Sequence, residues 1–307
     1  MDPQRGITGT QKIVPSIWFD HDAEEAGQFY AAALPNTTSR VKARYPDEVP
    51  EWQASFAGQP LVVEISIADL EVTLINAGDE FRPTPAISFL LNFDPLALGG
   101  VEAARVALDA TWAALSDGGK ALMELGEYPF SPHYGWLEDR YGVSWQLMLT
   151  DPEGEPRPFA ITQLMFSGAV QDKAREATEL YVSLFDDAGF GSVVEYPQAT
   201  GTAGAGSVMF GEFHIGGQWF SMMDSNVEHA FTFTPGFSLQ ALCRDQAEID
   251  RLWEALSAVP EAEQCGWLVD RFGVSWQIVP ENMDELMQRP GAYGHMMQMK
   301  KLVIEDF

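Results

Sequence analysis

The sequence has few positive charges, few cysteines and no long apolar run. Its 307 residues include 18 Lys and Arg against 45 Asp and Glu, a formal net charge of −27. Such a surface repels phosphate, which excludes nucleic acids and anionic membranes as partners. Two cysteines, Cys243 and Cys265, cannot form a disulfide framework and are expected to be reduced thiols. Without an apolar leader or about 18 consecutive apolar residues, we expect a cytoplasmic protein that does not span a membrane.

The sequence does contain a long internal repeat. Residues 135–146 read GWLEDRYGVSWQ and residues 266–277 read GWLVDRFGVSWQ, with ten of the twelve positions identical. The hydrophobic fraction is 46%, and a chain of this length has room for about two domains. The protein therefore contains one structural unit twice.

The first half shows the order β-α-β-β-β two times. Asp22 is placed to cap the first helix, and Glu25 follows three residues later as in a capping box. A second helix is indicated by apolar residues that recur at helical spacing. The predicted strands are 13–19, 41–45, 61–67, 71–75, 86–93, 120–125 and 141–149, and the predicted helices begin at residue 22 and span 101–116.

The second half repeats this order after a linker. Residues 151–158 (DPEGEPRP) are rich in proline and acid and show no periodicity. We therefore predict a first module over 1–150, the linker over 151–158, and a second module over 159–307. The strand at 161–166 matches 13–18 at an offset of 148, and Ser238 matches Ser88 at 150.

Both ends of the chain depart from the repeat. Residues 1–11 form a polar arm, and residues 283–307 form a tail with a short helix expected at 296–300 and an extended end at 302–304. The segment 256–266 is ten residues shorter than 115–135, so the second module has lost part of a strand region. Short connections between the later strands favour hairpins over parallel pairing. The pattern predicts an α+β fold of four β-α-β-β-β units, each pair curled around a cleft.

Several motifs resemble one known family. They are WFD at 18–20 followed by AEEA at 23–26, CRDQ at 243–246, QCGWL at 264–268, FGVSWQIVP at 272–280 and MMQMKKLVI at 296–304. Together they resemble the PhnB-like proteins, also labelled 3-demethylubiquinone-9 3-methyltransferase. These belong to the vicinal oxygen chelate superfamily of glyoxalases, extradiol dioxygenases and bleomycin-resistance proteins. The resemblance implies tandem glyoxalase-like modules.

Methyltransferase activity is disfavoured despite the family's label. A site for S-adenosylmethionine normally needs a glycine-rich turn between a strand and a helix. The glycine-rich run at 201–206 (GTAGAG) instead leads into an expected strand at 207–210. We interpret this run as a loop.

The superfamily's usual metal site looks lost. The resemblance implies His and Glu ligands on facing strands, which hold a divalent ion that polarises a substrate. The first-strand ligand would fall near Pro15 and Gln163, and the fourth-strand acid near Asn76 and Asp224. The last ligand, normally Glu, is replaced by Gln146 and Gln277, which are weak neutral ligands. No resident metal or other cofactor is therefore expected.

The residues expected to line the clefts are Gln146, Gln277, Asn76, Asp224 and His214. Gln146 and Gln277 each follow a Trp on a strand, so Gln and Trp point to opposite faces. If Gln lines the cleft, Trp packs beneath a helix, although both positions are also consistent with a purely structural role. Arg140 and Arg271, which follow Asp139 and Asp270, are expected to form local turn salt bridges or to bind a carboxylate.

Three functions remain open from the sequence. The leading hypothesis is a binding protein that takes a small, partly apolar molecule without the usual metal, the two modules standing in for a homodimer. An alternative is a metal-dependent glyoxalase or dioxygenase type of enzyme with non-standard ligands such as His214 and Asp224. A third is a regulatory protein with one degenerate cleft, and the shortened 256–266 segment favours the second module for that. The ligand and the catalytic residues, if any, are not identified by the sequence.

Overall fold

The structure is a computed structural model that describes residues 11–307. The arm predicted for the first residues lies outside the described residues, apart from Gln11. The helices are α1 (Ala23–Ala33), α2 (Pro95–Leu98), α3 (Val101–Leu115), α4 (Ala174–Leu184), α5 (Gln246–Leu256), α6 (Met283–Leu286) and α7 (Ala292–Met296). The strands are β1 (Ile13–Phe19), β2 (Thr37–Arg44), β3 (Pro60–Ile67), β4 (Leu70–Asn76), β5 (Ile87–Phe93), β6 (Lys120–Tyr128), β7 (Ser131–Glu138), β8 (Ser144–Leu149), β9 (Ala160–Phe166), β10 (Ala188–Glu195), β11 (Val208–Ile215), β12 (Gln218–Asp224), β13 (Phe237–Cys243), β14 (Trp267–Val269) and β15 (Ser275–Pro280).

The strands form two sheets, and each sheet is shared between the two halves of the chain. Sheet A has the order β14-β15-β13-β1-β4-β3-β2, and sheet B has the order β10-β11-β12-β9-β5-β8-β7-β6. The halves meet at antiparallel pairs, β1 with β13 in sheet A and β5 with β9 in sheet B. The predicted modules 1–150 and 159–307 thus each contribute to both sheets. The mixed α+β class predicted from the sequence is confirmed.

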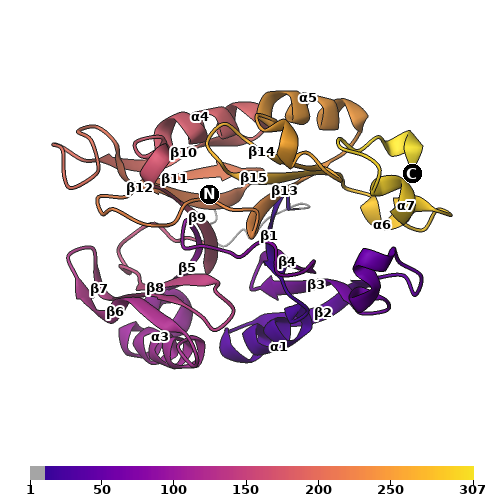
Figure 1. Ribbon diagram of the computed structural model, residues 1–307. Coiled ribbons are helices and arrows are strands. Elements are labelled where there is room, and N and C mark those ends of the chain that lie inside the picture. The colour runs from indigo at the N-terminus through magenta and orange to yellow at the C-terminus, as the bar shows by residue number, and fades with distance from the viewer. Residues whose placement is uncertain (1–10) are drawn as a thin grey trace.

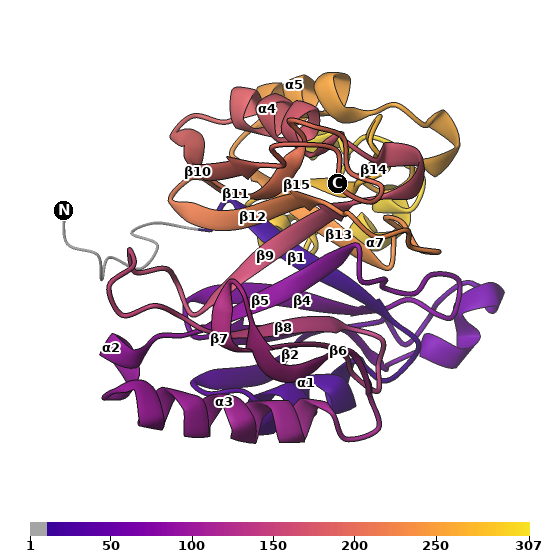
Figure 2. The ribbon, with the colours of Figure 1, turned by 90° about the vertical axis from the view of Figure 1, so that its left-hand side faces the viewer.

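The four longest helices lie at two opposite sides of the molecule, α4 and α5 on one and α1 and α3 on the other (Figure 1). Each sheet extends, strand beside strand, from one helical layer to the other, as the turned view shows (Figure 2). Strand residues alternate between a side that packs toward the helices, here called the helix face, and the opposite side, here called the open face. The helix faces of both sheets share one core, in which the rings of Phe89 and Phe237 lie 5.4 Å apart.

The strand register corrects the offset expected between β1 and β9. Ser16 pairs with Ser238, and Gln163 pairs with Ser88. Since Ser88 and Ser238 are equivalent, Ser16 is the counterpart of Gln163, and the offset is 147 rather than 148. A shift of one residue exchanges the two faces of a strand. Pro15 therefore lies on the helix face, and Ser16 takes the open-face position.

Helix α1 begins without the predicted capping box. The side chain of Asp22 makes no cap hydrogen bond. Instead, the backbone N–H of Ala23 donates to Oδ1 of Asn76 at 2.9 Å. In the second half, Asp224 Oδ1 likewise accepts from the N–H of Ala174, the first residue of α4, at 3.1 Å. Both helices are thus capped from the end of a strand distant in sequence.

The repeated stretch carries a buried aspartate that links helix α1 to the β7–β8 turn. Asp139 Oδ2 accepts from Tyr30 Oη at 2.9 Å and from Trp145 Nε1 at 2.8 Å, and its Oδ1 accepts from the backbone N–H groups of Tyr141 and Val143. Burial raises the pKa of Asp139 to about 6, although these hydrogen bonds act to lower it.

Asp270 repeats this arrangement in the second half. Its Oδ2 accepts from Tyr181 Oη at 2.6 Å and from Trp276 Nε1 at 3.0 Å. Burial again raises the pKa of the carboxyl group. The salt bridges expected within each turn are therefore wrong in their partners, because Arg140 pairs with Asp117 and Arg271 with Glu176.

The C-terminal tail takes the place of the strand missing from the second half. The backbone N–H groups of Cys265 and Gly266 donate to the carbonyl oxygens of Met299 and Lys300, at 2.8 and 2.7 Å. These two acceptors stand beside the segment equivalent to β7, where β6 stands in sheet B. The helix of the tail, α7, ends at Met296, so the helix expected at 296–300 is wrong. Of the extended end expected at 302–304, Val303 is extended, whereas Ile304 begins a short 3-10 helix.

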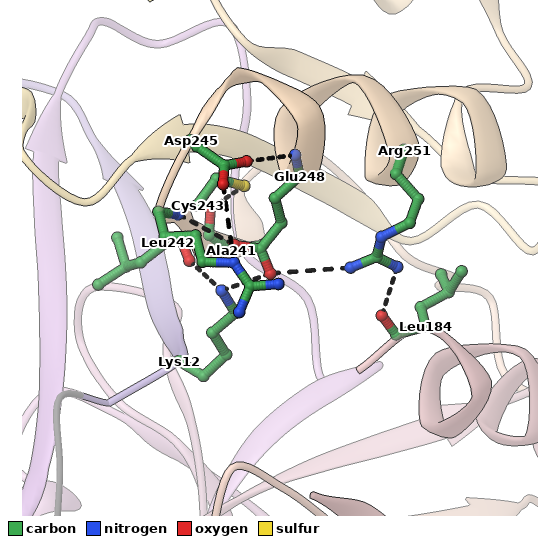
Figure 3. A network of polar contacts seen from close by, with 9 residues as sticks. Lys12, Leu184, Ala241, Leu242, Cys243, Asp245, Glu248 and Arg251 are labelled. Atoms are coloured by element: carbon green, nitrogen blue, oxygen red, sulfur yellow. Dashed lines mark hydrogen bonds and ion pairs between the residues drawn. The ribbon is translucent and has the colours of Figure 1, made fainter. Parts of the chain in front are cut away.

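A polar network joins Lys12, the residue before β1, to the second half of the chain (Figure 3). Lys12 Nζ contacts Glu248 Oε1 at 2.8 Å and donates to the carbonyl of Leu242 at 2.5 Å. Glu248 lies in the first turn of α5 and is 6% exposed. Burial alone would raise the pKa of Glu248, but Lys12 and the N–H of Arg244 outweigh it and lower the pKa. The nearby thiol of Cys243 is buried, which raises its pKa to about 12 and keeps it protonated.

Candidate functional site

The open face of sheet B has a row of four buried polar side chains across four neighbouring strands. They are Gln146 on β8, Ser88 on β5, Gln163 on β9 and Ser221 on β12, and none is more than 7% exposed. Gln146 Nε2 donates to Ser88 Oγ at 2.9 Å, and Tyr134 Oη donates to Gln146 Oε1 at 2.7 Å. All four side chains are buried, so the row lies inside the protein rather than on a solvated surface.

Sheet A has the equivalent row, Gln277 on β15, Ser238 on β13, Ser16 on β1 and Thr73 on β4. Gln277 Nε2 donates to Ser238 Oγ at 2.9 Å. The position equivalent to Tyr134 is Cys265, and the donor to Gln277 Oε1 is instead Gln240 Nε2 at 3.3 Å. Both terminal atoms of this amide are therefore paired within the protein.

The two rows differ in the groups that lack a protein partner. In sheet B, Gln163 Oε1 and Ser221 Oγ are buried and have no hydrogen-bond partner in the protein. The amide nitrogen of Gln163 reaches only the thioether sulfur of Met223, at 2.9 Å, which is a weak acceptor. In sheet A, Ser16 Oγ is the corresponding atom without a protein partner. Buried polar groups are usually paired, so these atoms retain unused hydrogen-bonding capacity.

The surroundings of the rows also differ. Around the row of sheet B, Tyr134, Trp136 and Met165 form a cluster separate from the main core, with Met148, Met223 and Phe231 packed against it. His229, in the loop between β12 and β13, stacks on Phe231 with ring centroids 4.6 Å apart. The open face of sheet A instead packs against the tail: Val279 and partly buried Leu242 belong to a cluster with Leu286, Ala292, Leu302 and Phe307.

The structure separates the predicted cleft residues. Gln146 and His214 lie on the open face of sheet B although they come from different halves, and Gln277 lies on the open face of sheet A. Asn76 and Asp224 lie on the helix faces, where their side chains cap α1 and α4. Their placement away from the open faces follows from strand alternation, because Thr73 and Ser221, three residues earlier, point to the open side.

The alternative ligand pair His214 and Asp224 is not brought together. His214 is on the open face of β11, with its ring 5.3 Å from that of Trp219, whereas Asp224 is on the helix face of β12. Asp224 Oδ2 also accepts from the N–H of Val208 at 2.8 Å. Glu212, which shares the face of His214, is held by Arg157 through Nε and Nη2, each at 2.9 Å.

The residues of the rows do not fit the metal that the superfamily implies. Divalent ions of that kind are bound by imidazole and carboxylate groups, whereas both rows contain only hydroxyls and neutral amides. Within residues 11–307, no group of three or more His, Cys, Asp and Glu side chains is arranged to hold an ion. No step is therefore assigned to a metal here.

The sequence did not predict the serine residues of the two rows as cleft residues. Ser16, Ser88, Ser221 and Ser238 were not among the predicted cleft residues, although the Ser88–Ser238 match was visible in the repeat. The usable signal is a polar residue inside a short, mostly apolar strand, such as Ser88 in ISFLLNF at 87–93. The glycine-rich run at 201–206 leads into β11 rather than into a helix, as expected.

A surface groove of about 800 Å³ lies at the edge of sheet A, between residues 46–50 and the tail. Its lining includes Met287, Tyr293 and Met297. None of the lining side chains has a buried polar atom without a partner. The lining also includes the charged side chains of Glu48 and Arg289, so the groove combines apolar and charged contacts. Among the described residues, no helix is long and apolar enough to cross a membrane.

Three β-α-β-β-β units and a last unit that lacks one strand are joined in pairs in the two sheets, with polar rows on the open faces. They define a tandem protein of the vicinal oxygen chelate superfamily, as predicted. The family model described as 3-demethylubiquinone-9 3-methyltransferase matches residues 11–148 and 159–279. The chain therefore belongs to this PhnB-like family. No match was found among curated proteins.

Solved structures similar to the chain match either about half of it or nearly all of it. A PhnB protein from Bacillus cereus is 31% identical over 46% of this chain and 100% of its own, with a TM-score of 0.39. A protein from Pseudomonas aeruginosa is 20% identical over 46% of this chain and 98% of its own, with a TM-score of 0.36. Glyoxalase I from Zea mays is 11% identical over 91% of this chain and 94% of its own, with a TM-score of 0.48.

Proposed function

We propose that the protein binds a small, uncharged, partly apolar molecule on the open face of a sheet, through hydrogen bonds and without a resident metal. The observation that carries this proposal is the pair of buried Ser and Gln rows. They stand on the strands where the superfamily resemblance places metal ligands. A hydroxyl or a neutral amide orients a ligand by hydrogen bonding but brings no charge to hold a cation.

The charge of the ligand follows from the same surroundings. Neither row contains an ionised side chain, and an unpaired charge buried there would be very unfavourable. The nearest ion pair on the open face of sheet B, Arg157 with Glu212, is already satisfied. The Met and aromatic neighbours supply apolar contact. Methyl transfer is not proposed, because the glycine-rich run leads into a strand.

Thermal melting tests the proposal. Untagged protein is melted against a panel of divalent ions and a panel of uncharged heteroaromatic compounds, and metal content is measured by mass spectrometry. A ligand that binds only the folded state raises the melting temperature with its concentration. We expect a saturable rise with at least one uncharged compound and none with the ions. Near-stoichiometric metal, or a saturable rise with one ion that is lost in His214→Ala, would refute the proposal.

A further inference from the structure

We infer that the two open faces are not equivalent, and that sheet B carries a site for an uncharged planar compound presenting a hydrogen-bond donor beside an acceptor. This deepens the proposed function and rests on it. The internal duplication makes the comparison direct, because each residue of the row in sheet B has a counterpart in sheet A. The inference depends on two groups, Gln163 and Ser221.

Gln163 and Ser221 form a neighbouring pair of polar groups with unused hydrogen-bonding capacity. They are partners in register on the parallel strands β12 and β9, so both side chains project from the same face. Gln163 is 2% and Ser221 is 0% exposed. Gln163 Oε1 can accept a hydrogen bond, and the Ser221 hydroxyl can donate or accept one. A ligand group with an N–H next to a C=O would satisfy both residues at once.

Sheet A lacks this combination. The counterparts of Gln163 and Ser221 are Ser16 and Thr73, so no amide oxygen is available at that place. The neighbouring amide of Gln277 has its oxygen and nitrogen engaged by Gln240 and Ser238. The tail covers part of this face, through Val279 and its partners. In sheet A, more of the polar atoms of the row are therefore paired within the protein, and the C-terminal tail packs on this face.

The side chains that pack around the row of sheet B indicate the shape of the ligand. Met148, Met165 and Met223 surround the row together with Trp136 and Phe231. Methionine side chains are flexible and polarisable and adapt to the faces and edges of aromatic rings. A flat ring system is therefore the best match for these side chains, with its polar edge directed at Gln163 and Ser221. The loop containing His229 and Phe231 lies over this face and must shift as the ligand enters.

The test uses three probes of nearly equal size on the full chain. 2-Quinolone is uncharged and flat and presents N–H beside C=O, N-methyl-2-quinolone lacks the donor, and naphthalene lacks both polar groups. Dissociation constants are measured by calorimetry for wild type, Gln163→Met and Ser221→Ala. Ser16→Ala and Thr73→Val are the matched controls on sheet A. A melting curve for each variant establishes that it folds.

We expect 2-quinolone to bind wild type about tenfold more tightly than N-methyl-2-quinolone, the ratio for one lost hydrogen bond to a buried group. Gln163→Met and Ser221→Ala should each weaken 2-quinolone binding about tenfold, and the sheet A variants should leave it within about twofold. Equal affinity for the two quinolones, or sensitivity to Ser16→Ala and Thr73→Val instead, would overturn the assignment to sheet B while preserving ligand binding as such. If neither these probes nor any uncharged compound of the melting panel binds, the proposed function fails as well.

Discussion

The buried carboxyl of Asp139 makes stability depend on pH in a way that the structure specifies. Its pKa is raised from 3.8 to about 6 by burial. A carboxyl whose pKa is higher in the folded state favours folding when it is protonated, and that contribution is lost as pH rises through the folded-state pKa. Asp139 should therefore contribute most to stability below about pH 4 and progressively less up to pH 7.

The magnitude follows from the size of the pKa shift. A difference of one pKa unit corresponds to about 1.4 kcal/mol, so the shift of Asp139 amounts to about 2–3 kcal/mol between pH 4 and pH 7. Asp139→Asn removes the titration and keeps an oxygen for the N–H groups of Tyr141 and Val143. The new amide nitrogen faces the Trp145 N–H donor, so the variant should also be less stable than wild type at pH 4.

The assay is urea unfolding of wild type and Asp139→Asn at several pH values between 4 and 7, followed by circular dichroism. The other carboxylates are common to both proteins, so their contributions cancel in the difference. We expect the stability advantage of wild type to shrink by about 2–3 kcal/mol as pH rises from 4 to 7. Asp270→Asn should change in the same direction, because burial also raises the pKa of Asp270. A difference that stays constant, or that grows toward pH 7, would refute this account of the aspartate.

Three further substitutions test the contacts that position the sheets. Asn76→Ala should destabilise the fold by about 1–2 kcal/mol in urea unfolding, because α1 loses its cap. Gln240→Leu should lower the stability of the fold by about 1 kcal/mol, because it leaves Gln277 Oε1 unpaired. Leucine is the residue at the equivalent position in sheet B. An unchanged unfolding midpoint would contradict this pairing. Lys12→Met should destabilise the fold by about 1–3 kcal/mol at pH 7, because the carboxylate of Glu248 loses its ion-pair partner. The loss should be smaller at pH 4, because Glu248, whose pKa is lowered in the folded state, is then increasingly protonated in the variant. A larger loss at pH 4 would show that the ion pair is not its cause.

Much of the fold was readable from local sequence. The duplicated stretch at 135–146 and 266–277 revealed the repeat because its residues are constrained by one local geometry. Asp139 and Asp270 accept hydrogen bonds from two N–H groups of their own turn and from a Trp six residues on. Alternation along the strands also separated the Trp positions, which pack in the core, from the adjacent Gln positions. The helix predicted at 101–116 closely matches α3, because its apolar spacing is unambiguous.

Contacts between distant segments were not readable in this way. The capping of α1 by Asn76 joins residues 53 positions apart. The side chain of Asn76 points to the helix face, which places it outside the candidate site. The offset between β1 and β9 depended on which residues face each other across a sheet, and an error of one residue put Pro15 where Ser16 belongs.

The sequence by itself determined that related units occur four times, the last one shortened, that Gln146 and Gln277 replace the Glu that the resemblance implies, and that the chain is strongly acidic. Only the tertiary structure decided that β1 pairs with β13 and β5 with β9, so that each open face combines residues from both halves. It also decided that Gln163 and Ser221 are left with unpaired polar atoms while Gln277 is fully paired. The physical reason is that backbone pairing between strands imposes the same hydrogen-bond pattern whichever half supplies the partner. The partner is chosen by the packing of all the helices and sheets together, which a local sequence pattern does not encode.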